Sequence, residues 1–224
     1  MPEGFPIIIV NLKTYSQGYG YEGFKLCKIM EELSKEFNVN LAAAVSAVDI
    51  QDYSDNLKIP VFAQHVDGVS FGSNTGSILP EAVKQDGAFG TLINHAECQL
   101  SPEEIQASLQ RCRDVGLSTV LCTADVEATK RGAALDPDML AVEPPELIGG
   151  EISVSTAKPE VIRDSVSAVN QINPGIPVLC GAGVKDQADV SKALSLGSQG
   201  ILLASGVVKS SEPRKVLIDL IQGL

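Results

Sequence analysis

Residues 141–150 read AVEPPELIGG and join an apolar run to a loop rich in proline and glycine. The run Met139–Val142 ends on a carboxylate, Glu143, and two prolines and two glycines follow within seven residues. Proline fixes φ at the start of the loop, whereas glycine leaves its far end free to bend. The pattern predicts a buried strand that delivers a general base, Glu143, to the mouth of a mobile lid. The alternative is an ordinary strand–loop junction whose glutamate faces solvent.

An apolar run followed by a helical pattern recurs along the chain on both sides of this stretch. The runs expected to form strands lie at residues 7–12, 41–45, 60–65, 91–94, 119–123, 139–142, 177–181 and 200–204. The helical patterns lie at residues 24–37, 47–57, 80–85, 102–115, 125–133, 158–172, 187–196 and 213–221. Continuous apolar runs are typical of parallel strands covered by helices on both faces. Eight such units of 28 residues in a chain of 224 predict a closed (β/α)8 barrel, an α/β fold that forms a single domain over residues 1–224.

The runner-up fold is an open, Rossmann-like sheet. In that fold the first strand leads into a glycine-rich turn that binds the phosphates of a dinucleotide. Here the first strand leads into Asn11-Leu12-Lys13-Thr14-Tyr15, which contains no glycine. The sequence therefore favours the barrel.

The composition is that of an acidic globular protein, with 44% hydrophobic residues and a net charge of −11. Nucleic acid or an anionic membrane would be repelled, so neither is expected as a partner. The five cysteines are scattered, without the CxxC or CxxH spacing of a zinc site. Neither a targeting segment nor an apolar stretch near the ~20 residues of a membrane span is recognisable. We therefore expect a soluble, cytoplasmic protein with reduced thiols and no metal.

Polar residues follow several of the expected strands, at the end of the barrel where active sites lie. Asn11 and Lys13 follow the first strand, and their i, i+2 spacing points both side chains the same way. His95 follows the fourth strand at the expected entry to a helical turn, where a helix N-terminus would keep its ring neutral and able to polarise a carbonyl. The alternatives are a lysine that lies along the surface and a structural histidine. We interpret His65, after the third strand, as structural.

Small residues end the last two expected strands. Gly181-Ala182-Gly183 follows the seventh strand, and Ala204-Ser205-Gly206 follows the eighth. Their backbone N–H groups are open to an anion, and the phosphate sites of barrels often lie at these two turns. One such glycine turn is weak evidence for phosphate binding, but the two together favour a phosphate site.

Five segments in this order, spread over almost the whole chain, resemble the triosephosphate isomerase family, and the short lid and chain length resemble its archaeal form. The segments are Asn11-x-Lys13, Asn94-His95-x-Glu97, EPPELIG at residues 143–149, CGAG at residues 180–183 and LASG at residues 203–206. The resemblance implies a TIM barrel that interconverts dihydroxyacetone phosphate and glyceraldehyde 3-phosphate in glycolysis and gluconeogenesis. It implies neither a metal nor an organic cofactor.

The resemblance also implies roles for single residues. Glu143 is the base that moves a proton between C1 and C2 of the substrate, and His95 is the electrophile. Lys13 and Asn11 hold and stabilise the enediolate. The backbone groups expected to receive the phosphate belong to Ile148, Gly149, Gly183, Ala204 and Ser205. Proton abstraction beside a carbonyl needs a base, an oxyanion stabiliser and a cation, and these side chains supply all three.

The segment Gly72-Ser73-Asn74-Thr75-Gly76 resembles the family's third loop, which reaches into a partner subunit beside the active-site lysine. The resemblance therefore implies self-association as a homodimer or a homotetramer, with Thr75 in contact with the neighbouring site.

Three positions depart from the family pattern. Ala96 stands where a serine usually contacts the base, Cys98-Gln99 replace basic residues, and Gly149-Gly150-Glu151 replace the usual Gly-Thr-Gly at the end of the lid.

Two alternatives therefore remain. One is another phosphosugar barrel, an isomerase or lyase, which would keep the phosphate turns without needing the three catalytic side chains together. The other is a non-catalytic barrel that serves as a binding module, which Ala96 and Cys98 favour.

Overall fold

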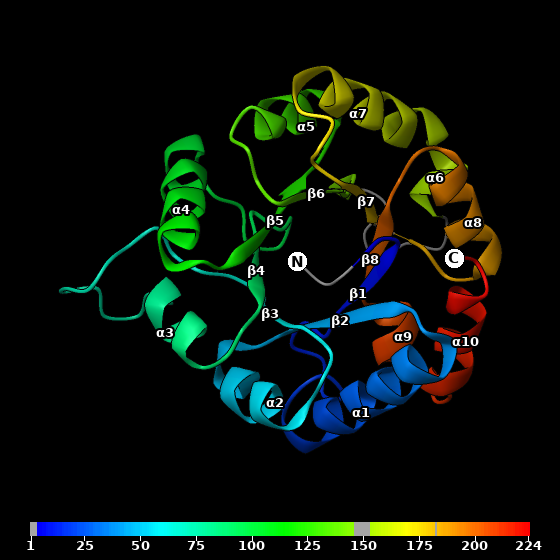
Figure 1. The fold of residues 1–224 in the computed structure, drawn as a ribbon, viewed down its shortest axis with the longest axis horizontal. Helices are drawn as coiled ribbons and strands as arrows, with labels where there is room; N and C mark the ends of the chain where they lie inside the picture. The colour runs from blue at the N-terminus through cyan, green and yellow to red at the C-terminus, as the bar shows by residue number, and fades with distance from the viewer. Residues whose placement is uncertain (1–3, 146–152, 182) are drawn as a thin grey trace.

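A closed barrel of eight parallel strands forms the centre of the molecule (Figure 1). The computed structural model describes residues 4–145, 153–181 and 183–224. The strands are β1 (Ile7–Asn11), β2 (Asn40–Val45), β3 (Val61–Ala63), β4 (Gly90–Ile93), β5 (Ser118–Thr123), β6 (Met139–Val142), β7 (Val178–Gly181) and β8 (Gly200–Leu203). Each strand pairs with the next in chain order, and β8 pairs with β1. The predicted (β/α)8 barrel is confirmed, and the open sheet is wrong.

Helices surround this barrel (Figure 1). They are α1 (Gly20–Phe37), η1 (Ala47–Asp49), α2 (Ile50–Asn56), α3 (Pro80–Gln85), α4 (Pro102–Val115), α5 (Val126–Ala133), α6 (Val154–Ala157), α7 (Pro159–Ile172), α8 (Gln187–Ser195), α9 (Ser205–Val208) and α10 (Pro213–Ile221). The expected helix at residues 47–57 divides into η1 and α2. The helices α6 and α9 were not predicted, because four residues are too few to show a helical period.

The best-marked helix in the sequence is α4. Ser101 caps it through a capping box, in which the serine hydroxyl accepts from the N–H of Glu104 and the Glu104 carboxylate accepts from the N–H of Ser101. Pro102 occupies the first turn, where its missing N–H costs no hydrogen bond. Gly116 ends the helix in the left-handed conformation at φ 73°. These local signals fix where the chain turns back toward β5.

Successive residues of a strand point to opposite faces, and this divides the core in two. Ile7 and Ile9 face the barrel interior, whereas Ile8 and Val10 pack against the helices outside. The interior cluster comprises Ile7, Ile9, Ala42, Ala44, Phe62, Leu92, Val120, Cys122, Met139, Ala141, Leu179 and Leu202. Both faces are apolar, which explains the continuous apolar runs. The filled interior leaves the strand ends as the place for a site.

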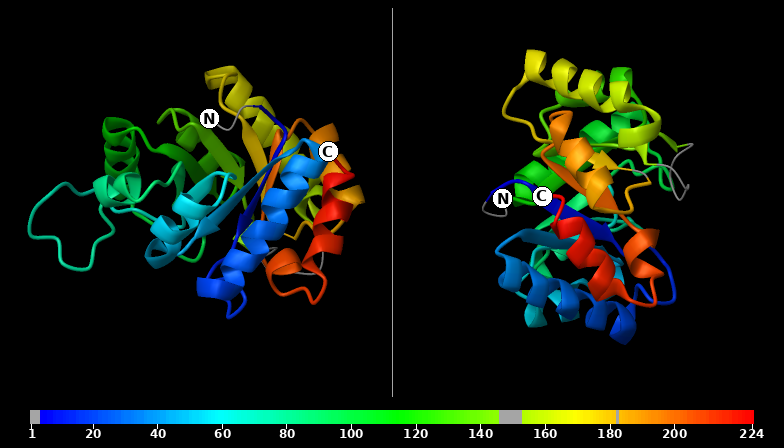
Figure 2. Two further views of the ribbon diagram at one scale, coloured as in Figure 1. Left: turned by 60° about the horizontal axis from the view of Figure 1, so that its bottom comes forward. Right: turned by 90° about the vertical axis from the view of Figure 1, so that its right-hand side faces the viewer.

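A long loop between β3 and α3 projects away from the barrel (Figure 2). Its base is closed by Asp67, whose N–H donates to the carbonyl of Ile78 at 2.9 Å and whose carboxylate accepts the N–H of Ile78 at 2.6 Å. All residues from 70 to 77 are exposed, including Thr75. In the described ranges, no helix combines the length and the apolar character needed to cross a membrane.

Candidate active site

A cavity of about 230 Å³ lies at the carboxyl ends of the strands. It brings together four side chains from β1 and from the segments that follow β1, β4 and β6, namely Asn11, Lys13, His95 and Glu143. The same cavity is lined by the three described residues expected at the phosphate, namely Gly183, Ala204 and Ser205. Ile148 and Gly149, also expected there, lie outside the described residues. The barrel therefore gathers residues that are up to 194 positions apart in the sequence, counting from Asn11 to Ser205.

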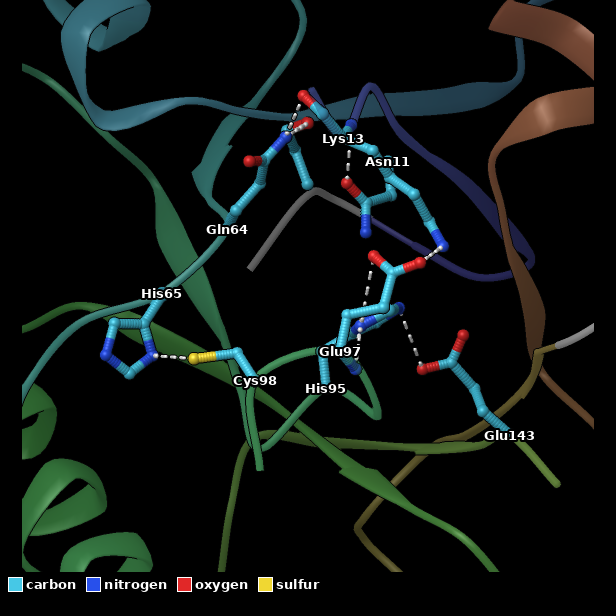
Figure 3. A network of polar contacts seen from close by, with 9 residues as sticks. Asn11, Lys13, Gln64, His65, His95, Glu97, Cys98 and Glu143 are labelled. Atoms are coloured by element: carbon cyan, nitrogen blue, oxygen red, sulfur yellow. Dashed lines mark hydrogen bonds and ion pairs between the residues drawn. The ribbon is translucent and has the colours of Figure 1, made fainter. Parts of the chain in front are cut away.

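Lys13 is held in place from three directions (Figure 3). Its Nζ lies 2.6 Å from Oε1 of Glu97, and its side chain is only 10% exposed. Its backbone takes the left-handed φ of 49°, which is unusual for a residue with a side chain. Asn11 Oδ1 accepts the N–H of Lys13 at 3.0 Å, and Gln64 Nε2 donates to its carbonyl at 3.0 Å. Lys13 is thus a fixed cation at the cavity and not a mobile surface lysine.

The ring of His95 is oriented by the backbone of its own turn. Nδ1 accepts the N–H of Glu97 at 3.1 Å, so the proton of the neutral ring lies on Nε2. Nε2 lies 3.8 Å from Oε2 of Glu143 (Figure 3). The N–H of Cys98 closes the turn onto the carbonyl of His95 at 2.7 Å, but the next helix begins only at Pro102. The expected turn is present as a single turn at His95, but no helix begins there, and the Glu97 N–H selects the tautomer instead.

Glu143 is a buried carboxylate with one oxygen, Oε2, that has no hydrogen-bond partner among the described residues. Burial raises the pKa of this carboxyl, while His95, the Cys122 thiol and Lys13 act to lower it. A carboxylate that is desolvated in this way is a stronger base than one in water. The geometry thus supports the general base that the sequence predicted, and the solvent-facing alternative is wrong.

Gly181, at the end of β7, makes room for Glu143. A Cβ built on Gly181 would overlap Cγ of Glu143 and would lie 3.0 Å from its Oε1. Gly181 was predicted only as part of the phosphate turn, so this role was missed. Val142 pairs with Cys180 across β6 and β7, and this pairing places Glu143 beside Gly181. No local pattern in the sequence indicates that contact.

The part of the cavity where phosphate is expected is lined by Gly183, Ala204 and Ser205. Gly183 has φ 71°, a conformation that favours glycine. The first N–H groups of a helix have no partner within it, and in α9 these belong to Ser205 and Gly206. Tyr15 and Lys185 also line the cavity, and neither was predicted. Lys185 adds a second cation to the side of the cavity that carries Gly183.

The arrangement combines a desolvated carboxylate, an imidazole N–H and an ammonium group around one small cavity. These are the groups that proton abstraction next to a carbonyl requires, because the base takes the proton while the two donors stabilise the oxyanion. Across the part of the chain that the structure describes, no group of three or more His, Cys, Asp or Glu residues could hold a metal ion.

Two of the departures from the family pattern lie beside the site. Ala96 and Glu143 both line a small cavity of about 20 Å³. Cys98 lies on the other side of the turn, where its Sγ is 3.8 Å from Nδ1 of His65. His65, which we interpreted as structural, does not line the main cavity.

Comparisons with known proteins agree over almost the full length. The family model described as triosephosphate isomerase matches residues 6–223. The chain is 47% identical over 219 residues to the triosephosphate isomerase of Methanosarcina acetivorans, covering 98% of this chain and 99% of that protein. It is 45% identical over 216 residues to that of Methanocaldococcus jannaschii, covering 96% and 99%. A crystal structure of triosephosphate isomerase from Bartonella henselae has a similar fold, with a TM-score of 0.75 at 19% identity over 97% of this chain and 96% of that one.

Proposed function

The chain belongs to the triosephosphate isomerase family, and from this premise we propose that it interconverts dihydroxyacetone phosphate and glyceraldehyde 3-phosphate with Glu143 as the proton carrier. The observation that carries the assignment of the base is the unpartnered Oε2 of Glu143, which lies 3.8 Å from Nε2 of His95 at the cavity. A substrate bound in the cavity would contact both groups, the base at a carbon and the donor at the neighbouring oxygen.

The reaction needs two proton transfers at neighbouring carbons. Glu143 removes a proton from C1 of dihydroxyacetone phosphate, and Nε2–H of His95 donates to the carbonyl oxygen as it becomes negative. The ammonium of Lys13 and the amide of Asn11 stabilise the enediolate that results. The hydroxyl proton of O1 passes to O2, with His95 as the group that faces both oxygens, and Glu143 then returns its proton to C2. The ion pair with Glu97 keeps the Lys13 side chain, which is only 10% exposed, in one position, so its charge is already in place when the oxyanion forms.

The phosphate of the substrate is held at the opposite end of the cavity. The N–H groups of Gly183 and Ser205 and the backbone of Ala204 line this end, and Lys185 adds a positive charge. We assign Ile148 and Gly149 to the same phosphate from the family resemblance alone. Binding the phosphate fixes the three-carbon chain, so that its reacting carbons reach Glu143 and His95.

The protein acts as a homodimer or a homotetramer in this proposal. The loop between β3 and α3 projects away from the barrel (Figure 2), and its exposed residues 70–77 include Thr75, which suits a contact with the neighbouring site. A cytoplasmic location is also proposed, and five free cysteines are consistent with a reducing compartment. Light scattering that finds a fully active monomer would contradict the oligomer.

One coupled assay on the purified protein distinguishes the possible functions of this chain. We expect it to interconvert dihydroxyacetone phosphate and glyceraldehyde 3-phosphate, and we expect 2-phosphoglycolate to bind at the same cavity. Binding of 2-phosphoglycolate without any isomerase activity would instead indicate a binding module. Activity on a different phosphosugar alone would indicate another phosphosugar barrel. A Gly183→Leu variant should lose most of the 2-phosphoglycolate affinity measured by calorimetry, because the leucine side chain would fill the phosphate end.

A further inference from the structure

One carboxylate, that of Asp189 in the first turn of α8, holds the turn where phosphate is expected. This phosphate turn is the segment that joins β7 to α8, and its residues Gly183 and Lys185 line the catalytic cavity. Oδ2 of Asp189 accepts the N–H of Lys185 at 3.1 Å. Oδ1 accepts the hydroxyl of Thr156 in α6 at 3.2 Å, across 33 positions of the chain. The two oxygens of one side chain therefore join the phosphate turn to another helix.

A buried hydroxyl makes a second link between the same two helices. Oγ of Ser155 in α6 donates to the carbonyl of Asp189 at 3.2 Å, and it lies 2.8 Å from Oγ of Ser153. Ser153 caps α6, because its Oγ also accepts the N–H of Ser155. The side chain of Ser155 is fully buried, so water cannot replace these partners. The helices α6 and α8 are thus joined through both the backbone and the side chain of Asp189.

These links lie on the other side of the barrel from the loop that we propose to contact a neighbouring subunit. Figure 1 shows α6 and α8 side by side, with α3, α4 and the projecting loop across the barrel from them. The groups that Asp189 contacts belong to its own chain, and holding them requires no access from solvent. The contacts are therefore the same in a monomer and in an oligomer.

The phosphate turn needs support because its backbone has unusual freedom. Gly183 takes the left-handed φ of 71°, and glycine loses more conformational freedom on ordering than any other residue. A turn that is ordered before the anion arrives loses less conformational entropy on binding. Fixing Lys185, two residues after Gly183, should therefore raise the affinity for phosphate.

The negative charge of Asp189 has the opposite effect on an anion. Like charges repel, so a carboxylate that contacts the phosphate turn lowers the affinity for phosphate. If charge decided the affinity, removal of Asp189 would make phosphate bind more tightly. If position decides it, removal makes phosphate bind more weakly. The direction of the change therefore separates the two effects.

We propose that Asp189 is a positioning residue, which fixes the phosphate turn against α6 so that the turn is in place before the substrate binds. The role rests on the proposed function, because it assumes that the cavity receives a phosphorylated substrate. Asp189 does not line the cavity, so it acts through the turn and not by contact with the substrate. The alternative is a cap of α8 alone, for which the bond to Lys185 would matter and the bond to Thr156 would not.

Calorimetry with 2-phosphoglycolate on the intact protein measures the effect of each contact. Asp189→Ala removes both side-chain hydrogen bonds, so the affinity should fall at least about fivefold. Asp189→Asn keeps the geometry, because its amide oxygen accepts the N–H of Lys185 and its amide nitrogen donates to the hydroxyl of Thr156, which can accept as well as donate. Since the charge is also removed, Asp189→Asn should bind 2-phosphoglycolate at least as tightly as the unmutated protein does.

Variants of α6 test its links to Asp189 separately from the cap. Thr156→Val has nearly the same shape but no hydroxyl, and it leaves the bond between Asp189 and Lys185 in place. The affinity should fall at least about twofold, and Ser155→Ala should lower it in the same way. Thr156→Ser keeps the hydroxyl and should bind as the unmutated protein does. Added to Asp189→Ala, Thr156→Val should change nothing further, because the bond that it removes is already lost.

Kinetic constants distinguish a misplaced turn from a generally loosened protein. In Asp189→Ala, KM for glyceraldehyde 3-phosphate should rise by about the factor by which the affinity falls. With glyceraldehyde, which has no phosphate, the rate of proton exchange at C2 should be unchanged, because Glu143 and His95 keep their positions. General loosening would lower the rate with both substrates. Thermal melting followed by circular dichroism checks the folding of each variant.

Tighter or unchanged binding in Asp189→Ala would overturn the positioning role, and so would an equal loss in Asp189→Asn. Unchanged affinity in Thr156→Val would leave Asp189 as a helix cap and overturn the link to α6. If Asp189→Ala does not fold, the comparison of Thr156→Val with Thr156→Ser still decides that link.

The positioning role and the proposed reaction fail separately. If the unmutated protein binds 2-phosphoglycolate but has no isomerase activity, the proposed reaction is wrong, while the affinities of the variants still decide the role of Asp189. If the unmutated protein does not bind 2-phosphoglycolate, both proposals are wrong.

Discussion

The two histidines of this chain use the same ring in opposite ways. In His95 a backbone N–H, that of Glu97, occupies Nδ1, so Nε2 carries the proton and donates. In His65 a carboxylate, that of Asp67, occupies Nε2, so Nδ1 is left as an acceptor. Both residues follow neighbouring strands, β3 and β4, at the same end of the barrel. The group that fixes one nitrogen therefore decides whether the other acts as a donor or as a base.

The two rings also differ in what they face. The His95 side chain is 7% exposed and faces a carboxylate oxygen with no hydrogen-bond partner among the described residues, whereas the His65 side chain is 18% exposed and faces an exposed thiol. Buried polar groups interact more strongly than exposed ones because water does not screen them. We therefore expect the large effects on isomerisation at His95 and its partners, and none at His65.

The largest effect is expected from Glu143→Gln, which removes the carboxylate that His95 faces and that we propose as the base. Glutamine keeps the size of the side chain but cannot accept a proton at neutral pH. A positioned general base contributes roughly 10²–10⁴ in rate, so kcat should fall by at least about 10² while KM changes little. Steady-state kinetics in the coupled assay measures both constants. Glu160→Gln, an exposed carboxylate in the first turn of α7, serves as the control and should be fully active.

A Glu143→Gln enzyme that retains more than about a tenth of kcat lies outside the range for a general base and would make the assignment wrong. In that case the role of His95 as the facing donor would lose its basis as well.

The next effect compares the two rings directly. His95→Leu removes the donor for the carbonyl oxygen, and the loss of one such donor costs roughly 10²–10³ in kcat. His65→Leu should leave kcat and KM within about twofold, because His65 does not line the catalytic cavity. Both variants are assayed under the same conditions, with circular dichroism as the check on folding. Equal losses in the two variants would show that the rings do not have the separate roles that their hydrogen bonds indicate.

Gly181→Ala should have an intermediate effect, because the added methyl group displaces Glu143 from its position next to His95. A Cβ at Gly181 would lie 2.9 Å from Cδ of Glu143, closer than such contacts allow. We expect kcat to fall roughly tenfold, since a misplaced base loses part of its advantage in orientation. Gly175→Ala is the matched control, because a Cβ there meets only Oδ1 of Asn173 at 3.1 Å. Unchanged kcat in Gly181→Ala would mean that Glu143 has room to reposition without loss.

The contrast between Glu143 and Gly181 also shows how far the sequence could be interpreted. The strands and their polar ends were predictable, because each is a local pattern: an apolar run, then Asn11 and Lys13, or Asn94 and His95. The space that Gly181 leaves for Glu143 depends on two strands that meet only in the folded barrel. The pair of Lys13 with Glu97 spans 84 positions in the same way, so its geometry has no signal along the chain.

Lys185 and Tyr15 show the same limit. Each stands near a residue that was predicted, Gly183 or Lys13, but nothing in its neighbours indicates that it lines the cavity. The short helices α6 and α9 were missed for a related reason, because a single turn has no period to detect. The outcome for His95 is more instructive, since its neutral ring was predicted from a helix N-terminus and instead follows from one N–H of the adjacent turn.

A smaller effect is expected on stability, because the buried carboxylate of Glu143 should lower the free energy of unfolding. Burial raises its pKa in the folded state, so the folded protein binds this proton more tightly than the unfolded chain does. The protonated carboxyl therefore makes its full contribution to the free energy of unfolding below the pKa of the unfolded chain, about 4.3. This contribution is lost as the pH rises through the pKa of the folded state. Glu143→Gln should be more stable than the unmutated protein by about 1 kcal/mol at pH 8, and the difference should shrink toward pH 4.

Urea unfolding at several pH values measures this difference. Glu160→Gln is again the control, because an exposed carboxylate should give no such dependence. A Glu143→Gln variant that is less stable at pH 8 would contradict an uncompensated buried carboxylate and would imply a partner for Oε2.

The smallest effect is expected from Ala96→Ser, which restores the residue that the family usually has after the histidine. Ala96 and Glu143 line a cavity of about 20 Å³, which leaves room for a hydroxyl beside the carboxylate. The hydroxyl would donate to Glu143, and a hydrogen bond of this kind contributes about 0.5–1.5 kcal/mol. Such a bond stabilises the ionised carboxylate and so lowers the pKa of Glu143. The bond stabilises the ionised carboxylate, which is the form that has yet to accept the proton, so kcat should change by less than about threefold. The pH at which kcat/KM rises should become lower. A pH profile identical to that of the unmutated enzyme would show that the serine hydroxyl does not reach Glu143, and that the turn holding His95 tolerates either residue without consequence for the base.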